Sequence, residues 1–255
     1  MAALRPKSNT ELAIMRQGGA MLGELFTKIK AMIAPGITPK ELDAFAYDFI
    51  IKHNSKPSFK GYKVGGGVKY PATICASVNE VVIHGIPGKV PLKDGDIIGI
   101  DIGLCFRGYH VDSAETYAVG KISPAARKLI DTTEAAFFAG MKALHGGVHL
   151  GDMSHAIQTT VEREGYSVVR QFAGHGIGSH LHEDPQVSNY GKPGHGPVLA
   201  AGVTIAVEPM VNMGHHEVIM LDDDWTIVTD DGSLSSHYEH TVAVTDDGYE
   251  LLTNR

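Results

Sequence analysis

The sequence is poor in the residue types and patterns that mark several large classes of protein. It has two cysteines, Cys75 and Cys105, in 255 residues, which is too few for a disulfide framework. Because both lie in apolar, strand-like runs, we expect reduced thiols in the core of a cytoplasmic protein. No apolar stretch approaches the roughly 18 residues of a membrane span, and the opening residues hold no signal-peptide run. We therefore expect no membrane partner.

Positive charge is also scarce. Lysine and arginine total 22 against 29 aspartates and glutamates, which gives a formal net charge of −7 with no basic cluster. Since binding of nucleic-acid phosphates requires clustered basic side chains, we expect no direct contact with nucleic acid. Hydrophobic residues make up 43% of the chain and charged residues 20%, which is ordinary for a soluble globular protein with a large core.

The order of the expected elements repeats along the chain. Capping patterns and apolar spacing predict one helix after Ser8 that ends before Pro35, and another after Thr38. A loop follows over 54–71, and then come predicted strands over 72–84, 96–106 and 109–119, helices over 123–144 and 152–164, and strands over 167–173, 204–212, 217–220, 225–229, 236–245 and 249–252. We predict a single α+β domain over 1–255, with mainly antiparallel strands and two related halves of about 8–120 and 121–255.

Five potential metal ligands lie in apolar segments that are mostly strand-like. They are Asp101 in IIGIDIG, Asp112 in RGYHVDSAET, His175 in FAGHGIG, Glu208 in TIAVEPM and Glu239 in SSHYEHTVAV. Buried carboxylates are rare unless they are paired or bound to a cation. Four carboxylates and an imidazole are too many, and too rich in oxygen, for a single structural zinc ion. They fit two divalent ions about 3.5–4 Å apart that activate a shared water, which favours an enzyme over a binding module.

Asp101 and Asp112 can be interpreted in two ways, as ligands of a shared metal centre or as two unrelated carboxylates. A turn near Arg107 and Gly108 predicts a hairpin that brings the two carboxylates together, where they repel each other unless cations intervene. Taken alone, the pair is explained more simply by a turn cap and a solvent-exposed side chain. A glycine-rich turn with solvated histidines, and edge strands facing water, would likewise account for the other three donors. Each of these explanations is simple for one residue, but all of them must hold at once if the five donors do not share a metal centre. We therefore favour the shared metal centre.

Five segments carry a resemblance that covers nearly the whole chain. The order Asp, Asp, His, Glu, Glu with these spacings is similar to that of the dinuclear metallopeptidases of the pita-bread fold. Within that group, the chain resembles the short bacterial form of the type I methionine aminopeptidases, in PSFKGY (57–62), CASVNEVVIHGIP (75–87), GHGIGSHLHEDPQVSNYG (174–191), IAVEPMV (205–211) and SLSSHYEHTVAVTDDGYELLT (233–253). The resemblance implies the pita-bread fold, which has two pseudo-symmetric halves, an antiparallel sheet and outer helices. We expect neither an N-terminal zinc-finger extension nor a long insertion in the second half, and for this reason the chain is similar to the short bacterial form.

The resemblance further implies an activity and the roles of the matching residues. The activity is metal-dependent removal of the N-terminal, initiator methionine from nascent proteins and peptides, with a small second residue preferred. The five donors would hold two divalent ions, with cobalt, manganese, iron, zinc and nickel as candidates, and Asp112 and Glu239 would bridge them. Glu208 would also act as general base, His182 would hydrogen-bond the scissile carbonyl, and His84 would contact the substrate backbone. The matching methionine pocket consists of Phe59, Tyr62, Tyr70, Cys75, Leu181 and Trp225, and a monovalent-cation site is matched by Asn79, Val81 and Ser235.

Three features depart from that family's pattern and bear on substrate range. The segment KVGGGVK (63–69) is inserted beside the expected pocket, Leu181 stands where an aromatic residue is common, and His237 replaces a common glutamine. Two alternatives stay open: an Xaa-Pro aminopeptidase of the same fold, which the HGIP and NYG segments oppose, and a non-catalytic binding protein, which should have lost ligands. We expect a monomer that acts on peptides and nascent chains, with the ribosome as a candidate partner.

Overall fold

The computed structural model describes residues 4–63 and 67–254. Its helices are α1 (Asn9–Met32), α2 (Pro39–Lys52), α3 (Pro124–Lys142) and α4 (Leu150–Arg163). The first two begin at capping boxes, in which a Ser or Thr side chain and a Glu three residues later satisfy the free N–H groups of the first turn. The four predicted helices are therefore confirmed, and α4 begins slightly earlier than predicted. None of the helices in the described part of the chain is long and apolar enough to cross a membrane.

A large antiparallel sheet joins the two halves of the chain. Its main path runs β1 (Lys56–Pro57), β4 (Ile97–Phe106), β5 (Tyr109–Ala118), β13 (Ser235–Val244), β9 (Thr204–Val207), β7 (Gly174–Gly176) and β8 (Glu183–Val187). Off this path lie β2 (Ile74–Val78), β6 (Ser167–Val168), β10 (Met210–Asn212) and β14 (Tyr249–Leu251). A second sheet contains β11 (Val218–Met220), β12 (Ile227–Thr229) and β3 (Val81–Ile83). The hydrogen-bonded pair β5–β13 connects the halves, and the assignment to a single domain stays a prediction.

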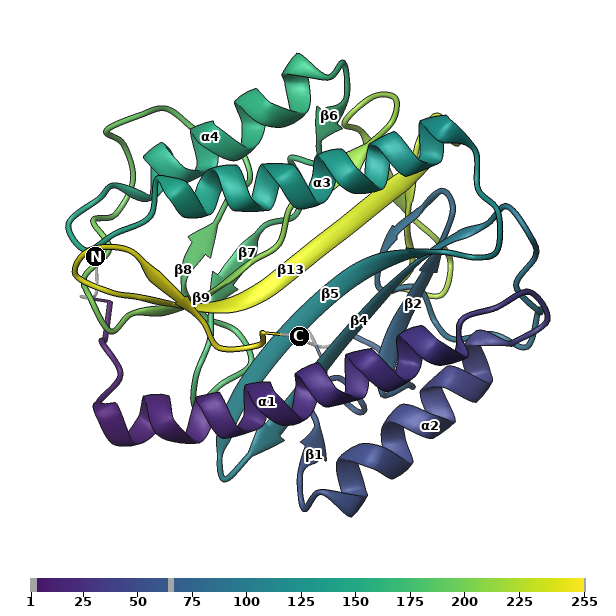
Figure 1. Ribbon diagram of the computed structural model, residues 1–255, viewed down its shortest axis with the longest axis horizontal. Coiled ribbons are helices and arrows are strands. Elements are labelled where there is room, and N and C mark those ends of the chain that lie inside the picture. The colour runs from purple at the N-terminus through teal and green to yellow at the C-terminus, as the bar shows by residue number, and fades with distance from the viewer. Residues whose placement is uncertain (1–3, 64–66, 255) are drawn as a thin grey trace.

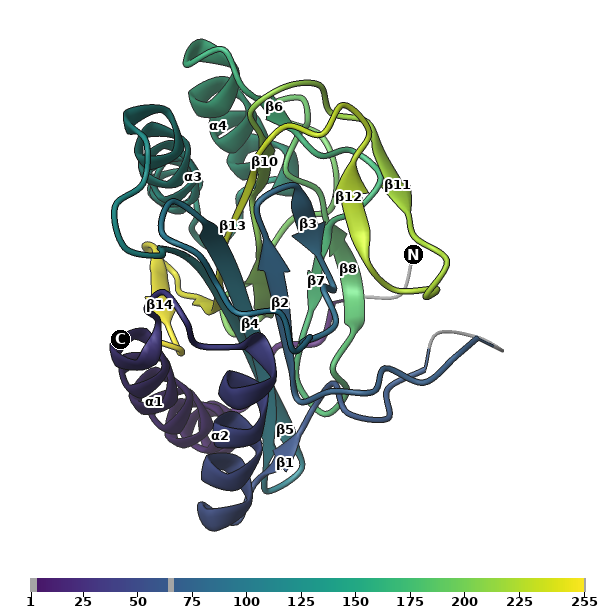
Figure 2. The same cartoon turned by 90° about the vertical axis from the view of Figure 1, so that its right-hand side faces the viewer.

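The helices and the small sheet lie on opposite sides of the large sheet. Helices α1 and α2 lie along one end of the sheet and α3 and α4 along the other (Figure 1). Figure 2 shows all four helices on one side, with the β11–β12 hairpin on the other. One apolar cluster contains the buried faces of α1 and α2 and extends to Tyr70 and Trp225, and a second packs under α3 and α4. Gly18 of α1 packs against Leu104 and Val111, so the opposite face of β4 and β5, which carries Asp101 and Asp112, is the one that the helices leave free.

Several predicted strands were wrong in length or were missed. The predicted strand over 72–84 is two strands, because Asn79 adopts a positive φ of 56° between them. The predicted strand over 204–212 is interrupted at Pro209, which cannot donate to the ladder, and 167–173 contains only the short β6. Strands β1, β7 and β8 were not predicted, because they lie in segments rich in glycine and polar residues. Cys75 is buried as expected, but Cys105 is only partly buried, so its placement in the core was wrong.

Candidate metal centre and active site

A cavity of about 410 Å³ opens on the free side of the large sheet. This volume is in the range of small-molecule sites. All the residues predicted to bind metal, to act in catalysis or to form the methionine pocket line it: Phe59, Tyr62, Tyr70, Cys75, His84, Asp101, Asp112, His175, Leu181, His182, Glu208, Trp225 and Glu239. The three residues predicted to hold a monovalent cation lie outside this cavity.

The strand register places the five donors on one face of the sheet. The β4–β5 hairpin turns at Arg107 and Gly108 as predicted, and it pairs Asp112 with Gly103, two residues along β4 from Asp101. Because side chains two residues apart share a face of a strand, the two carboxylates point to the same side. Ala114 pairs with both Asp101 and Glu239, which carries this face from β4 through β5 to β13.

The same face continues into the second half of the chain. On β13, Thr241 lies two residues from Glu239 and pairs with Ala206, and Ala206 also pairs with His175 on β7. Glu208 lies two residues beyond Ala206, directly after β9 ends. Separate segments therefore deliver all five donors to one cavity through backbone pairing.

Glycines beside His175 allow β7 to pack between its neighbours. A Cβ atom on Gly174 would lie 2.3 Å from the Ala206 carbonyl oxygen, and one on Gly176 would lie 2.1 Å from that of Asp184. Both distances are too short for any side chain, so these positions require glycine. The glycines that the sequence places around His175 therefore serve close packing of three strands, and not a solvated turn.

The donor atoms lie close together. One ligand atom each of Asp112, His175 and Glu239 falls within 4.8 Å of the others, a spacing that can hold a metal ion. His175 Nε2 lies 3.7 Å from Glu208 Oε1, and His237 Nε2 lies 3.8 Å from Glu208 Oε2. Asp101 Oδ1 is buried and has no hydrogen-bond partner in the described structure, which is costly unless a cation contacts it.

The electrostatics of the cavity also favour a cation. Burial, together with the charges of Asp112 and Glu208, raises the pKa of Asp101 far above its usual value. Burial raises the pKa of Asp112, and burial and the charge of Asp112 raise that of Glu208. Burial lowers the pKa of His175 to about 3, so its imidazole is neutral and free to coordinate. A divalent cation would remove the repulsion among these carboxylates, and the oxygen-rich donor set fits such an ion.

His182 lies beside this centre on the loop between β7 and β8. Its ring centroid is 4.3 Å from that of His175, and its Nδ1 forms a short hydrogen bond with the Tyr62 hydroxyl. Burial lowers the pKa of His182, which favours the neutral ring. If the Tyr62 hydroxyl donates to Nδ1, the proton of the neutral imidazole resides on Nε2, where it can be donated to a substrate oxygen.

His84 follows β3 in a conformation that is rare for a residue other than glycine. Its φ is +58°, and its ring makes edge contacts with Phe172 and Trp225 at centroid distances of 6.0 Å. Burial, with a smaller effect of His182, lowers its pKa to about 4. A strained, buried and neutral histidine that lines the cavity is typical of a functional position.

An apolar pocket forms one wall of the cavity. Tyr70 packs edge-on against Trp225 at a centroid distance of 5.1 Å and against Phe59 at 6.5 Å. The Tyr70 hydroxyl lies 3.0 Å from the carbonyl oxygens of both Ile74 and Gly85, which share its single proton, so its polar end is satisfied by the backbone. Cys75 and Leu181 complete a wall that suits an unbranched apolar side chain.

Sequence reasoning missed part of the cavity lining. The additional residues are Ile83, Phe172, Ala173, Gly174, Glu183, Asp184 and Gln186. Two acidic residues directly after His182 were a signal that could have drawn attention to Glu183 and Asp184. The predicted insertion at 63–69 includes residues 64–66, which lie outside the described residues. Its base is closed by a hydrogen bond from the Tyr70 N–H to the Tyr62 carbonyl oxygen, at 2.9 Å.

These features define a hydrolase with a carboxylate-rich metal centre. The model described as Metallopeptidase family M24 matches residues 13–246, and the chain belongs to this family. It is similar to the methionine aminopeptidase of Clostridium perfringens, with 52% identity over 97% of both chains. It is also similar to methionine aminopeptidase 1 of Bacillus subtilis, with 49% identity over 97% of this chain and 98% of that protein.

A solved structure supports the same assignment. The crystal structure of methionine aminopeptidase from Rickettsia prowazekii matches with a TM-score of 0.95 and 38% identity, covering 98% of this chain and 100% of that one. The resemblance, the pita-bread fold and the prediction of a metallopeptidase are therefore confirmed.

Proposed function

We propose that this protein removes the N-terminal methionine from peptides and nascent proteins, and that it prefers a small second residue. The observation that carries the proposal is the placement of an apolar, aromatic-walled pocket in the same cavity as five converging metal donors. The pocket suits the methionine side chain, and the donors lie where the scissile bond would follow it. High similarity to methionine aminopeptidases over the whole chain supports the same substrate.

The donors are proposed to hold two divalent ions, with Asp112 and Glu239 shared between them and Asp101, His175 and Glu208 completing the set. Manganese, cobalt, iron, zinc and nickel all suit oxygen and imidazole ligands. When bound, such ions polarise a carbonyl oxygen and lower the pKa of a water. Two observations support this assignment: the buried Asp101 Oδ1 has no hydrogen-bond partner in the described structure, and the charges of Asp112 and Glu208 raise the pKa of Asp101.

The protein's own residues would then direct the reaction. A carboxylate oxygen of Glu208 accepts the proton of the attacking water, as a general base. His182 donates from Nε2 to the scissile carbonyl oxygen, where negative charge develops, and Tyr62 holds the ring in the required tautomer. His84 contacts the substrate backbone near its first residue. The pocket around Tyr70 and Trp225 holds the methionine side chain and excludes water from one side of the bond.

A monovalent cation beside the cavity is proposed at Asn79, Val81 and Ser235. The Asn79 side chain already donates to Asp96 and accepts from the Ile97 N–H, at 3.0 Å each. The Ser235 hydroxyl is hydrogen-bonded to Asn212 at 2.9 Å. The cation would therefore be held by main-chain oxygens, and it would act as a structural support. We further propose that the enzyme is a cytoplasmic monomer that meets its substrates as they leave the ribosome, where initiator methionines are exposed.

A peptide panel tests the proposed activity. Wild-type protein loaded with manganese or cobalt is given Met-Ala-Ser, Met-Leu-Ser and Ala-Pro-Ser, and the released amino acid is quantified. We expect fast release of methionine from Met-Ala-Ser, slower release from Met-Leu-Ser and little cleavage of Ala-Pro-Ser. Faster turnover of Ala-Pro-Ser would assign an Xaa-Pro aminopeptidase, and no turnover with any metal would assign a binding protein.

A further inference from the structure

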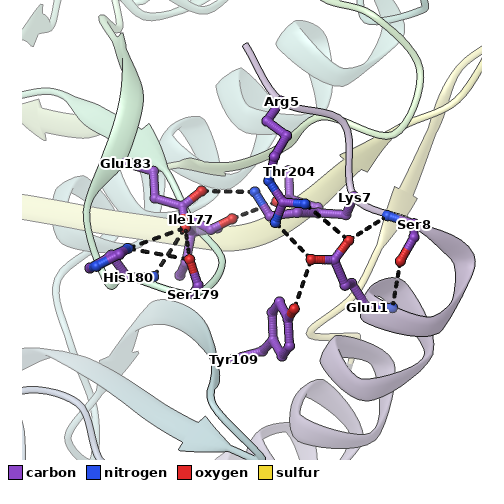
Figure 3. Close-up of polar contacts among 10 residues, drawn as sticks. All are labelled: Arg5, Lys7, Ser8, Glu11, Tyr109, Ile177, Ser179, His180, Glu183 and Thr204. Carbon is purple, nitrogen blue, oxygen red and sulfur yellow. Dashed lines mark hydrogen bonds and ion pairs between the residues drawn. The ribbon is translucent and has the colours of Figure 1, made fainter.

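The N-terminal segment before α1 reaches the loop that carries His182. Lys7 Nζ lies 2.8 Å from Glu183 Oε2, and the Lys7 side chain is only 3% exposed. Glu183 directly follows His182 and is the first residue of β8. A lysine and a glutamate that are 176 residues apart in sequence thus form a largely buried ion pair at the end of the loop (Figure 3).

Glu183 also holds the loop from within. Its Oε1 accepts a hydrogen bond from the His180 N–H at 3.0 Å and another from the Ser179 hydroxyl at 3.1 Å. Burial raises the pKa of this carboxyl, but the hydrogen bonds from Lys7, His180 and Ser179 outweigh it, so the pKa lies below its usual value. One oxygen therefore binds the loop and the other binds Lys7.

Besides Glu183, the loop is attached through Thr204, which bonds Ile177, through the Tyr62 hydroxyl, which bonds the His182 ring, and through two backbone hydrogen bonds of Gly178. The Gly178 N–H donates to the His180 carbonyl oxygen, at 3.0 Å, and the His110 N–H donates to that of Gly178, at 2.7 Å. Both contacts lie before His182, and the Glu183 carboxylate is the side-chain anchor that comes directly after it. The position of His182 therefore depends on the Glu183 carboxylate as well as on the Tyr62 hydroxyl, which bonds its ring.

Lys7 is itself held in place on both sides. Its N–H donates to the Gly202 carbonyl oxygen at 2.7 Å. A Cβ atom on Gly178 would lie 2.3 Å from Lys7 Cε, so the glycine leaves the passage through which the lysine side chain reaches Glu183. The Lys7 side chain is therefore enclosed by its neighbours and is not a surface group that lies near an acid by chance.

The neighbouring side chains fix the segment that carries Lys7. Arg5 binds Glu11 through two hydrogen bonds, of 2.7 and 3.3 Å, and Tyr109 on β5 donates to the same carboxylate at 2.7 Å (Figure 3). Glu11 also closes the capping box with Ser8. The segment is thus attached to α1 and β5 before it reaches the loop.

We propose that Lys7 is a positioning residue for the reaction, which holds His182 in place through Glu183. The proposal rests on the proposed function, because His182 matters only if it contacts the scissile carbonyl. An ion pair that only tethered the N-terminus would stabilise the fold without affecting the chemical step. A positioning role affects kcat, because a displacement of about 1 Å at a catalytic group can slow a reaction by about 100-fold.

The test compares kcat and KM for Met-Ala-Ser in manganese-loaded wild type, Lys7→Met and Arg16→Met. Arg16 on α1 forms an exposed ion pair with Glu250 on β14, and neither residue contacts the loop in the described structure, so the Arg16 variant serves as the matched control. We expect Lys7→Met to lower kcat by about 10- to 100-fold while KM and manganese binding stay near wild type. Arg16→Met should retain the wild-type kcat.

Lys7→Met in the His182→Ala variant distinguishes a positioning role of Lys7 from a general effect on the stability of the fold. If Lys7 acts through His182, adding Lys7→Met to His182→Ala should slow turnover by less than about twofold, because residues that act in one unit are not additive. Glu183→Gln provides a second variant, because it keeps one side-chain oxygen and replaces the other with an NH2 group that cannot accept from Lys7. It should lower kcat, as Lys7→Met does. It also carries the test if Lys7→Met does not fold.

Three results would overturn the proposal: an unchanged kcat in Lys7→Met and Glu183→Gln, an equal slowing in the His182→Ala background, or a loss confined to thermal stability. Failure of the wild type to release methionine would instead refute the proposed function, and the positioning role with it.

Discussion

The proposed metal ligands and His182 are held in the cavity in two different ways. Asp101, Asp112 and Glu239 lie within long strands, where backbone pairing alone fixes the face to which they point. His182 lies on a loop, where side chains from remote segments provide support: Tyr62 at its ring and Lys7 at the neighbouring Glu183. The sheet therefore fixes the three carboxylates through its backbone. The position of His182 depends instead on side-chain contacts that a single substitution can remove.

The largest effect is expected from Glu208, the proposed ligand directly after β9 that also takes part in proton transfer. Glu208→Gln should slow turnover of Met-Ala-Ser by about 10²- to 10⁴-fold, because it removes the general base. Since β9 pairs through its backbone, the variant should keep its thermal unfolding midpoint. Turnover near the wild-type rate would mean that another group accepts the proton.

His182→Ala tests directly whether the histidine on the loop between β7 and β8 takes part in the reaction. We expect a loss in kcat of about 10²- to 10³-fold, the usual cost of removing one donor to a developing oxyanion. Manganese affinity measured by calorimetry should stay unchanged, because His182 is not among the proposed ligands. A variant that lost metal with normal kcat when saturated would instead place His182 in the ligand set.

Tyr62→Phe should have a smaller effect. It keeps the aromatic wall of the pocket but removes the hydroxyl that bonds His182 Nδ1. A hydrogen bond of this kind contributes about 0.5–1.5 kcal/mol, so kcat should fall by no more than about tenfold while KM stays close to wild type. A large rise in KM with normal kcat would show that the hydroxyl contacts substrate instead of orienting His182.

The placement of the strand carboxylates could be predicted from the sequence, whereas the support of the His182 loop could not. The role of these carboxylates as metal ligands stays a prediction. The β4–β5 hairpin follows from alternating apolar runs around a tight turn, so Asp101 and Asp112 could be placed together from local patterns. These carboxylates meet His175 and Glu208 through strand pairings between residues that lie 31 apart, as for His175 and Ala206, or 125 apart, as for Ala114 and Glu239. The apolar settings of the donors suggested one shared centre, but no local pattern predicted these pairings.

Other parts of the structure left no local signal. Strand β7 was missed because glycines flank His175, and the need for glycine arises from carbonyl groups of β8 and β9 that are remote from any sequence window. Lys7 belongs to an unremarkable polar segment before a helix, and its partner Glu183 lies 176 residues away. Contacts of this kind become visible only when the chain is folded.

The smallest effect on activity is expected from Thr241, whose side chain hydrogen-bonds the backbone of Asp112. Thr241 Oγ1 accepts from the Asp112 N–H at 2.8 Å and donates to its carbonyl oxygen at 2.9 Å. Thr241→Val keeps the shape but leaves these buried groups without partners, so the free energy of unfolding should fall by about 1–3 kcal/mol. Because pairing still fixes Asp112, kcat at saturating manganese should change little. A large loss of kcat would show that strand donors need side-chain support as well.

The most direct test of the account is a calorimetric titration of the metal-free protein with manganese, alongside Asp112→Asn. Since Asp112 is proposed to be shared between two ions, we predict two ions bound per wild-type chain and weakened binding of both in the variant. Binding of a single ion, or two-ion binding that Asp112→Asn leaves unchanged, would contradict the assignment of the five donors to one dinuclear centre.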